Sequence, residues 1–215
     1  MDLILVTGFE PFGGELINPA LEAVKLLEGR VLADHLLVTR PLPVVHGECI
    51  GTLIRHIRQV DPVLVVAVGQ AGGRIEMTPE RVAINVDDYR IPDNAGNQPA
   101  NGPVVAGGPV GYWSTLPVKA MVKALKEQGI PANVSNSAGT FVCNHLFYGL
   151  MHFLAREGGG RRGGFIHVPY LPEQAARLGG QPSMRLETLV RGLEVALTAA
   201  ALNPTDIRTT SGTVC

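Results

Sequence analysis

The sequence predicts an α/β protein in which a largely parallel, twisted sheet carries helices on both faces. Short apolar runs alternate along the chain with segments whose apolar residues recur at helical spacing. One run, Val63–Val68, is continuous and rich in β-branched residues, which is typical of a strand buried on both faces. The 215 residues, 46% of them hydrophobic, can enclose one large core, so we expect a single domain over residues 1–215.

The first part of the chain supplies four elements before this buried strand. Leu3–Thr7 is a short apolar strand, and Pro19–Leu27 is a helix with one apolar face. Leu36–Thr39 has the pattern of a second strand. The helix that follows ends before Pro62, because proline cannot continue a helix. Its apolar residues at helical spacing are Ile50, Leu53, Ile54 and Ile57.

The second part continues the alternation but contains one irregular region. We expect strands at Ala132–Ser135 and Gly164–Val168 and helices at Pro117–Gln128, Thr140–Ala155 and Pro182–Leu202. Val82–Val86 also has a strand pattern, whereas residues 88–111 are dense in proline, glycine and asparagine. A connection of this length is usually functional or interfacial.

A cysteine and a histidine lie where catalysis by a thiol needs them. Cys143 lies near the start of a predicted helix, and His167 near the end of a predicted strand. Unpaired N–H groups at a helix N-terminus lower the pKa of a thiol, and an adjacent imidazole can accept its proton. Ligands of open α/β sheets bind beyond the carboxyl ends of the strands. The loops expected to converge there follow Thr7, Val68, Ser135 and Val168. The pair therefore predicts covalent cysteine catalysis, although a free cysteine is also commonly buried for packing alone.

A third side chain should orient the imidazole of His167, as in other catalytic triads. Four candidates are barely separable from the sequence: Glu80, Asp87, Asp88 and Asn144. Glu80 has a slight advantage, because it precedes the strand pattern of residues 82–86 and lies near a glycine-rich loop. His145 is excluded as a partner of Cys143, because residues two apart on a helix face different directions.

Two aromatic residues occupy the loop over residues 8–14, directly after the first strand. The loop does not match a phosphate-binding loop, since Gly14 stands where the lysine would be. Phe9 and Phe12 can pack into the core, as aromatic residues often do. We favour the alternative that they form two walls of an apolar ligand pocket, because glycine and proline flank them.

The remaining histidines and cysteines do not suggest a metal site. No cysteine or acidic residue stands at metal-ligand spacing from His35, His46, His56 or His152. Cys49 is predicted to be a core residue on an apolar helix face, and Cys215 an exposed terminal thiol without a catalytic role. We therefore expect neither a metal nor another cofactor.

The charge pattern argues against nucleic acid and membrane partners. The net charge is −1, and the only basic cluster is Arg161-Arg162 in a glycine-rich turn. The amino terminus lacks the basic and apolar regions of a signal peptide, and Val63–Val68 is too short to span a bilayer. Three cysteines without framework spacing fit a reducing cytoplasm.

Five blocks of the sequence carry a wider resemblance. They are residues 6–14 with Asn18-Pro19, residues 69–74 with Glu80-Arg81, Asp93-Asn94, residues 135–144 and residues 164–172. In this order they resemble the pyroglutamyl peptidase I family of cysteine peptidases, also called pyrrolidone-carboxylate peptidases. The blocks run from residue 3 to about residue 173 and are highly specific together.

The resemblance implies a three-layer α/β/α fold of the phosphorylase/hydrolase-like type. It also implies removal of an N-terminal pyroglutamyl residue from peptides through a thioester acyl-enzyme. By the family's motif, the catalytic triad falls on Glu80, Cys143 and His167, and Arg90 lies near the oxyanion site. The residues that match the pocket for the lactam ring, or lie near it, are Phe9, Phe12, Phe141, Val142, Gln70 and Asn18. Family members are commonly cytoplasmic homotetramers.

Two other functions stay open from the sequence. A small-molecule binding protein could have kept the aromatic pocket and lost the chemistry, but the intact set Glu80, Cys143 and His167 argues against this. A cysteine amidase acting on a different acyl group is the second alternative. A comparison of substrates separates these functions.

Overall fold

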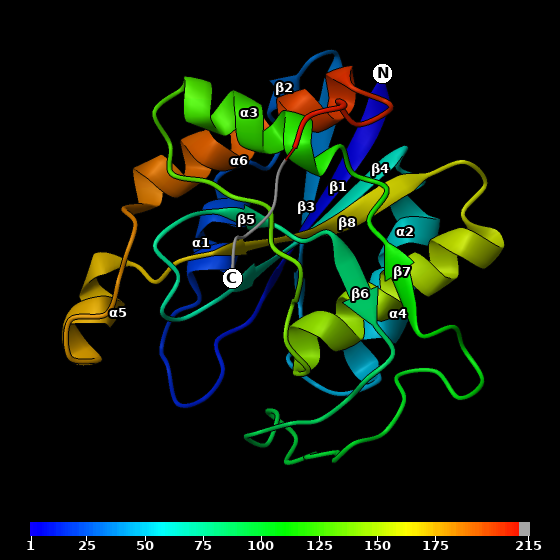
Figure 1. Cartoon of the computed structure of the whole chain (residues 1–215), viewed down its shortest axis with the longest axis vertical. Helices are drawn as coiled ribbons and strands as arrows, with labels where there is room; N and C mark the ends of the chain where they lie inside the picture. Colours follow the sequence, from blue (N-terminus) through cyan, green and yellow to red (C-terminus); the bar gives the residue numbers. More distant parts are fainter. Residues whose placement is uncertain (211–215) are drawn as a thin grey trace.

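The computed structural model describes residues 1–210 and contains a six-stranded sheet at its centre (Figure 1). The order of the strands across the sheet is β2 (Val31–Leu32), β3 (His35–Leu42), β1 (Asp2–Phe9), β4 (Leu64–Gln70), β8 (Arg162–Val168) and β5 (Thr78–Pro79). The four long strands are parallel, and the two short edge strands are antiparallel to their neighbours. The predicted α/β class with a largely parallel sheet is confirmed.

Helices pack against both faces of the sheet, as Figure 1 shows. On one face, α1 (Pro19–Lys25), α3 (Val118–Glu127) and α6 (Leu186–Leu202) share an apolar core with alternate strand residues such as Val66. On the other face, α2 (Glu48–Val60) and α4 (Val142–Glu157) pack on the residues between them, such as Val65. Successive strand side chains point to opposite faces, so a continuous apolar strand supplies both cores.

Close contact between α1 and β1 depends on a glycine. A Cβ on Gly8 would lie 2.8 Å from the Cα of Leu21, so no larger residue fits between the strand and the helix. Asn18 caps the helix, because its side chain accepts a hydrogen bond from the amide of Ala20, and Pro19 fills the first helical position. The chain leaving β1 is therefore held against the sheet after a loop of nine residues, 10–18.

Two predicted elements differ from the structure. Residues Ala132–Ser135 are not a strand and form only isolated bridges to Met77 and Glu80, because the neighbouring edge strand is itself two residues long. The last helix begins at Leu186 rather than at Pro182. Residues 182–185 are held extended by the amide of Met184, which donates to the carbonyl of Tyr170. A short helix, α5 (Pro172–Arg177), was not predicted.

The irregular region is flanked by two short strands, which pair with each other in a second, two-stranded sheet. Strand β6 (Val82–Ile84) pairs with β7 (Gly111–Trp113), which the sequence did not predict. Within the loop, Asp87 and Gly102 exchange two backbone hydrogen bonds, so the loop is closed at its base. Across residues 1–210, no helix is long and apolar enough to cross a membrane.

Candidate active site

Helix α4 begins at Val142, two residues later than predicted, and places Cys143 near its start, at its second residue. Cys143 is 9% exposed as a whole residue, and its sulfur lies against the end of β4, where a Cβ on Gly69 would lie 3.0 Å from the Cys143 Sγ. Gly69 is the register partner of His167 on the adjacent strand β8. The carboxyl ends of β4 and β8 and the first turn of α4 therefore bring the cysteine and the histidine to the same edge of the sheet.

The imidazole of His167 is held by Glu80. Its Nδ1 lies 2.7 Å from the Glu80 Oε1, and both side chains are buried. The backbone of Glu80 is fixed in turn, since its amide donates to the carbonyl of Phe165 on β8. The carboxylate accepts the Nδ1–H of the ring, which leaves Nε2 as the nitrogen that can exchange a proton.

The other three candidates for this position bind elsewhere. Asp87 accepts hydrogen bonds from two other histidines, Asp88 accepts one from the amide of Asn101, and Asn144 binds the backbone of strand β6. Of the four residues that the sequence could not separate, Glu80 is the one that the structure brings to His167.

The pKa of the Cys143 thiol differs from the value that the sequence predicts. Burial and, to a smaller extent, the Glu80 carboxylate raise the pKa of the Cys143 thiol to about 12, against the opposing effect of the Arg74 charge. We expected the N-terminus of α4 to lower the pKa of this thiol, whereas burial of the sulfur raises it. Burial also lowers the pKa of His167, against the opposing effect of Glu80. The resting pair is therefore a neutral thiol and a neutral imidazole, so the proton must move during attack.

The lowered pKa of His167 sets an expectation for the dependence on pH. Only the neutral ring can accept the thiol proton, so activity falls as His167 becomes protonated. We expect the acidic limb of kcat/KM to lie below pH 6.5, the ordinary pKa of histidine, for a substrate without titratable groups. An acidic limb clearly above this value would mean that the ring is charged in the free enzyme.

A cavity of about 830 Å³ opens beside this edge of the sheet. Thr140 and Phe141, the residues just before α4, form one side of it. The ring of Phe12 lies 5.8 Å from that of Phe141, so two predicted pocket residues make a joint apolar wall. Gln70 and Arg90, both predicted near the pocket, also line the cavity. Its other lining residues are Gly13, Glu15, Gly72, Gly73, Asp88, Ile91, Tyr170, Leu178 and Gln181.

Three predicted pocket residues do not line this cavity. Phe9 is 2% exposed and packs on Phe165 within the core, because it continues the inward face of β1. Asn18 is buried as the N-cap of α1, with its side-chain amide donating to the carbonyl of Glu10. Val142 is buried in the core as well. The packing and capping contacts of these three residues do not test substrate contact, since Cys143 and His167 do not line this cavity either. Their role in the pocket stays a prediction.

Other cavity residues were missed by the sequence reasoning. Tyr170, Leu178 and Gln181 come from the segment around α5, which the patterns did not predict as an element. The signal available for Tyr170 was its place two residues after strand β8, in the region where ligands of α/β sheets bind. Gln174 of α5 donates to the Oε1 of Gln70 at 3.0 Å and so fixes that cavity side chain.

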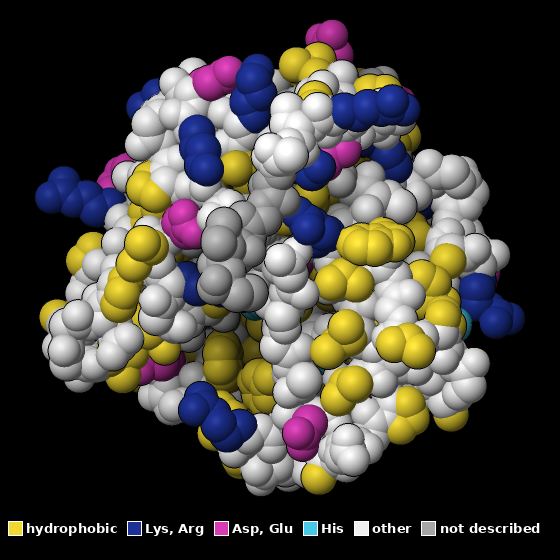
Figure 2. All heavy atoms as spheres, in the orientation of Figure 1, with side chains coloured by type: hydrophobic (Ala, Val, Ile, Leu, Met, Phe, Trp, Pro, Cys, Tyr) yellow, Lys and Arg dark blue, Asp and Glu magenta, His cyan; other side chains and the backbone are white. Residues whose placement is uncertain are grey.

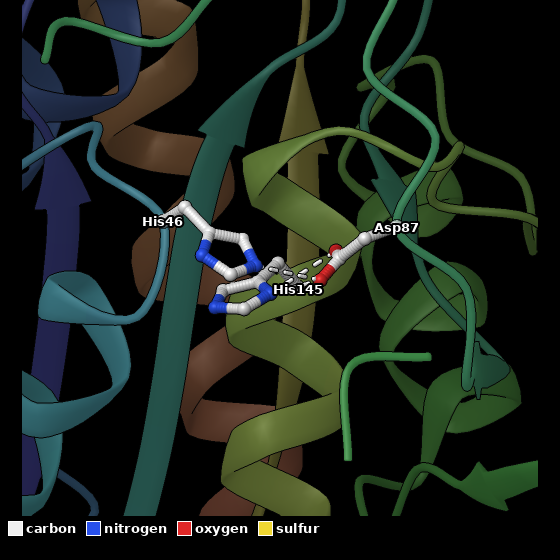
Figure 3. Close-up of side chains that lie close together, drawn as sticks. All are labelled: His46, Asp87 and His145. Carbon is white, nitrogen blue, oxygen red and sulfur yellow. Dashed lines mark hydrogen bonds and ion pairs between the residues drawn. The ribbon is translucent and has the colours of Figure 1, made fainter. Parts of the chain in front are cut away.

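His46, Asp87 and His145 form a cluster at the first turn of α4, which the sequence spacing did not reveal (Figure 3). Asp87 accepts from His46 Nε2 at 3.0 Å and from His145 Nδ1 at 2.8 Å. The amide of Gly47 donates to His145 Nε2 at 2.9 Å, so the proton of this neutral ring lies on Nδ1. The ring atoms already serve hydrogen bonds that tie the long loop to α2 and α4. The prediction that the chain binds no metal stays a prediction.

A methyl group at Gly69 tests how closely the thiol is packed. A Cβ there would lie 2.6 Å from Phe165 and 3.0 Å from the Cys143 Sγ. We expect Gly69→Ala to cost about 1–3 kcal/mol of stability and to lower kcat by displacing the thiol. Gly51→Ala is the matched control, because Gly51 lies within helix α2 with no atom near its would-be Cβ. This control should gain roughly 0.5–1 kcal/mol without loss of activity. Equal melting temperature and kcat of Gly69→Ala and wild type would contradict the packing described.

Comparison with known proteins agrees with this architecture. The profile of the pyroglutamyl peptidase family matches residues 2–203. A pyrrolidone-carboxylate peptidase of Cupriavidus taiwanensis is 57% identical over 213 residues, covering 99% of each chain. One of Brevibacillus brevis is 56% identical over 208 residues, covering 96% of each chain.

Solved structures give the same result. The crystal structure of pyroglutamyl peptidase I from Bacillus amyloliquefaciens matches 96% of this chain and all of its own, with a TM-score of 0.94 and 47% identity. A mutant pyrrolidone carboxyl peptidase from Pyrococcus furiosus matches 93% of this chain and 98% of its own, with a TM-score of 0.90 and 43% identity. The chain belongs to the pyroglutamyl peptidase family of cysteine peptidases.

Proposed function

We propose that this protein is a cysteine peptidase that removes an N-terminal pyroglutamyl residue from peptides, with Cys143 as nucleophile, His167 as base and Glu80 as the group that orients it. The observation that carries the proposal is the hydrogen bond between Glu80 and His167 at the sheet edge where the Cys143 thiol is packed. This arrangement lies beside a cavity with an aromatic wall, in a chain of the pyroglutamyl peptidase family.

The reaction proceeds by two transfers of the acyl group. The Cys143 thiol gives its proton to His167 Nε2 as sulfur bonds to the pyroglutamyl carbonyl carbon. His167 then protonates the leaving amine nitrogen as the C–N bond breaks, which leaves a thioester. A water molecule gives a proton to His167 and attacks the thioester, and the thiol takes a proton back as pyroglutamate leaves. Backbone N–H groups in the first turn of α4, together with Arg90, stabilise the oxyanion in both transfers.

Selectivity follows from the neutrality of the lactam ring. A pyroglutamyl group is uncharged and compact, so the joint wall of Phe12 and Phe141 can bury its ring. An ordinary N-terminal residue carries an ammonium group, and moving that charge into an apolar site costs several kcal/mol. Gln70 at the cavity supplies an amide for the polar edge of the lactam. Rejection of charged amino termini is therefore the main source of selectivity.

Turnover of matched chromogenic amides tests the proposal. We expect cleavage of the pyroglutamyl amide and little or no cleavage of the prolyl and alanyl amides. Cleavage of another acyl amide in preference would point to a cysteine amidase of different specificity. Binding of pyroglutamate without turnover of any amide would point to a binding protein that has lost the chemistry.

Phe12→Ala tests the aromatic wall. Loss of this ring should weaken the binding of a pyroglutamyl substrate by roughly 1–3 kcal/mol and lower the ratio of pyroglutamyl to alanyl kcat/KM. A core residue would behave differently, with a loss of roughly 3–5 kcal/mol in stability and unchanged selectivity. Phe147→Ala, whose ring is fully buried in the core, is the matched control and should show that second pattern. A destabilised but fully selective Phe12→Ala variant would contradict the pocket.

Assembly and location are part of the same proposal. We infer a single peptidase domain with the three-layer α/β/α arrangement of phosphorylase/hydrolase-like proteins, working as a cytoplasmic homotetramer on peptides, without nucleic acid or membrane partners. Exposed apolar side chains near strand β7 support self-association, since Val110 is 88% and Trp113 70% exposed. Figure 2 shows hydrophobic side chains gathered on this face. Light scattering of the purified chain measures the oligomeric state.

A further inference from the structure

Arg74 contacts the acid of the proposed triad, although its sequence pattern assigned it no role. It follows the glycine-rich turn after strand β4, and its Nη1 donates to the Glu80 Oε1 at 2.7 Å. Glu80 is fully buried, whereas the Arg74 side chain is 25% exposed. The Arg74 side chain therefore connects the protein surface to a carboxylate in the interior.

One oxygen of the Glu80 carboxylate accepts hydrogen bonds from both His167 and Arg74. The Glu80 Oε1 accepts from His167 Nδ1 and from Arg74 Nη1, each at 2.7 Å. If the imidazole were the only partner of this buried carboxylate, the negative charge of Glu80 would favour protonation of the His167 ring. The same charge would disfavour a negative charge on the Cys143 sulfur. The positive charge of Arg74 offsets both effects, because its guanidinium donates to the same carboxylate oxygen as His167.

Two further contacts hold the guanidinium in place. Its Nη1 also donates to the Thr78 hydroxyl, and its Nη2 donates to the carbonyl of Ser137 at 3.0 Å. Ser137 lies in the loop that leads into α4 and closes a small turn with Ser135. A planar fork can serve all these acceptors at once, whereas a lysine ammonium has no such geometry.

The effect of the arginine on the pair has a definite sign. After burial and Glu80, the Arg74 charge is the remaining influence on the Cys143 thiol, and it lowers the pKa of that thiol. It also lowers the pKa of His167 and that of Glu80. Two other titratable groups interact with the Cys143 thiol, namely the Cys49 thiol and the Tyr89 phenol. Burial raises the pKa of each strongly, so both are uncharged at neutral pH.

We propose that Arg74 is a positioning residue of this peptidase, which offsets the buried charge of Glu80 so that His167 stays free to accept the proton of Cys143. The inference rests on the proposed function for the roles of Glu80, Cys143 and His167. It adds a fourth side chain, which acts through Glu80 and need not touch the substrate.

The first experiment compares Arg74→Met with Arg74→Lys. Removal of the charge raises the pKa of His167, so the acidic limb of kcat/KM should move to higher pH in Arg74→Met. We expect kcat to fall roughly 10- to 100-fold with little change in KM. Arg74→Lys keeps a charge and should keep the acidic limb of wild type. Arg58→Met, which breaks an exposed pair with Glu157, is the matched control and should match wild type. An Arg74→Met profile superimposable on wild type would overturn the proposal.

A second readout does not depend on peptide cleavage. The rate of Cys143 alkylation by iodoacetamide is measured against pH and located by peptide mapping, so reaction at other thiols is not counted. Arg74→Met should need higher pH for the same rate, and Arg74→Lys should resemble wild type. This result would stand even if wild type failed to cleave pyroglutamyl amides, so the two proposals fail separately. Equal alkylation profiles of Arg74→Met and wild type would overturn this one.

Removal of Arg74 alone can destabilise the protein, because the buried Glu80 carboxylate then loses its cationic partner. A double variant serves as the control for this loss of stability. Arg74→Met combined with Glu80→Gln removes both charges. If the arginine acts through Glu80, the double variant should have a kcat within about threefold of Glu80→Gln alone. Any larger further loss would show that Arg74 acts independently of Glu80 and would contradict the inference.

Discussion

Replacement of Cys143 by alanine is expected to abolish turnover while the protein stays folded. Alanine removes the only atom that can form the thioester, and it favours the helical conformation of α4. Residual rate should be at the level of the uncatalysed reaction, measured with a pyroglutamyl amide after the fold has been checked by circular dichroism. Activity within tenfold of wild type would contradict covalent catalysis by this residue.

Two further variants control this result. Cys143→Ser should be almost as inactive, because a neutral imidazole activates a hydroxyl far less readily than a thiol at this site. Cys49→Ala should keep full activity, since Cys49 is fully buried and burial raises its pKa strongly. Loss of all alkylation-sensitive activity in Cys49→Ala would mean that the nucleophile has been misassigned. Cys215, predicted to be exposed, lies outside the described residues.

Glu80→Gln should give the second largest effect. We expect kcat to fall roughly 10- to 10⁴-fold with a smaller change in KM, because Glu80 orients the ring of His167. The hydrogen bond and charge of Glu80 raise the pKa of His167, so their loss should move the acidic limb of kcat/KM to lower pH. This direction is opposite to that expected for Arg74→Met. A change confined to KM would contradict an orienting role and reopen Asp87, Asp88 and Asn144.

The sequence could predict the parts of the fold that depend on local pattern. The run at Val63–Val68 became the central strand β4, and the helical spacing before Pro62 became α2. The short edge elements could not be predicted in this way. Residues 132–135 look like a strand, but a two-residue neighbour leaves them only isolated bridges.

The sequence could predict which residues belong to the candidate site better than it could predict which contacts those residues make. Phe9 shares the face of Leu5 on β1, and Asn18 precedes a proline, so period-two packing and helix capping could have predicted the contacts that both residues make within the protein. The grouping of His46, Asp87 and His145 brings together residues from distant segments, which no local spacing encodes. The raised pKa of Cys143 has the same origin, because burial depends on everything packed around α4.

The central claim is that Cys143 attacks a pyroglutamyl carbonyl, and an affinity label tests it most directly. A chloromethyl ketone carrying a pyroglutamyl group is incubated with the protein, beside the matched prolyl reagent, and the adduct is located by peptide mass spectrometry. We predict stoichiometric inactivation by the pyroglutamyl reagent alone, with the adduct on Cys143. Inactivation with the adduct on another residue, or equally fast inactivation by the prolyl reagent, would contradict the account.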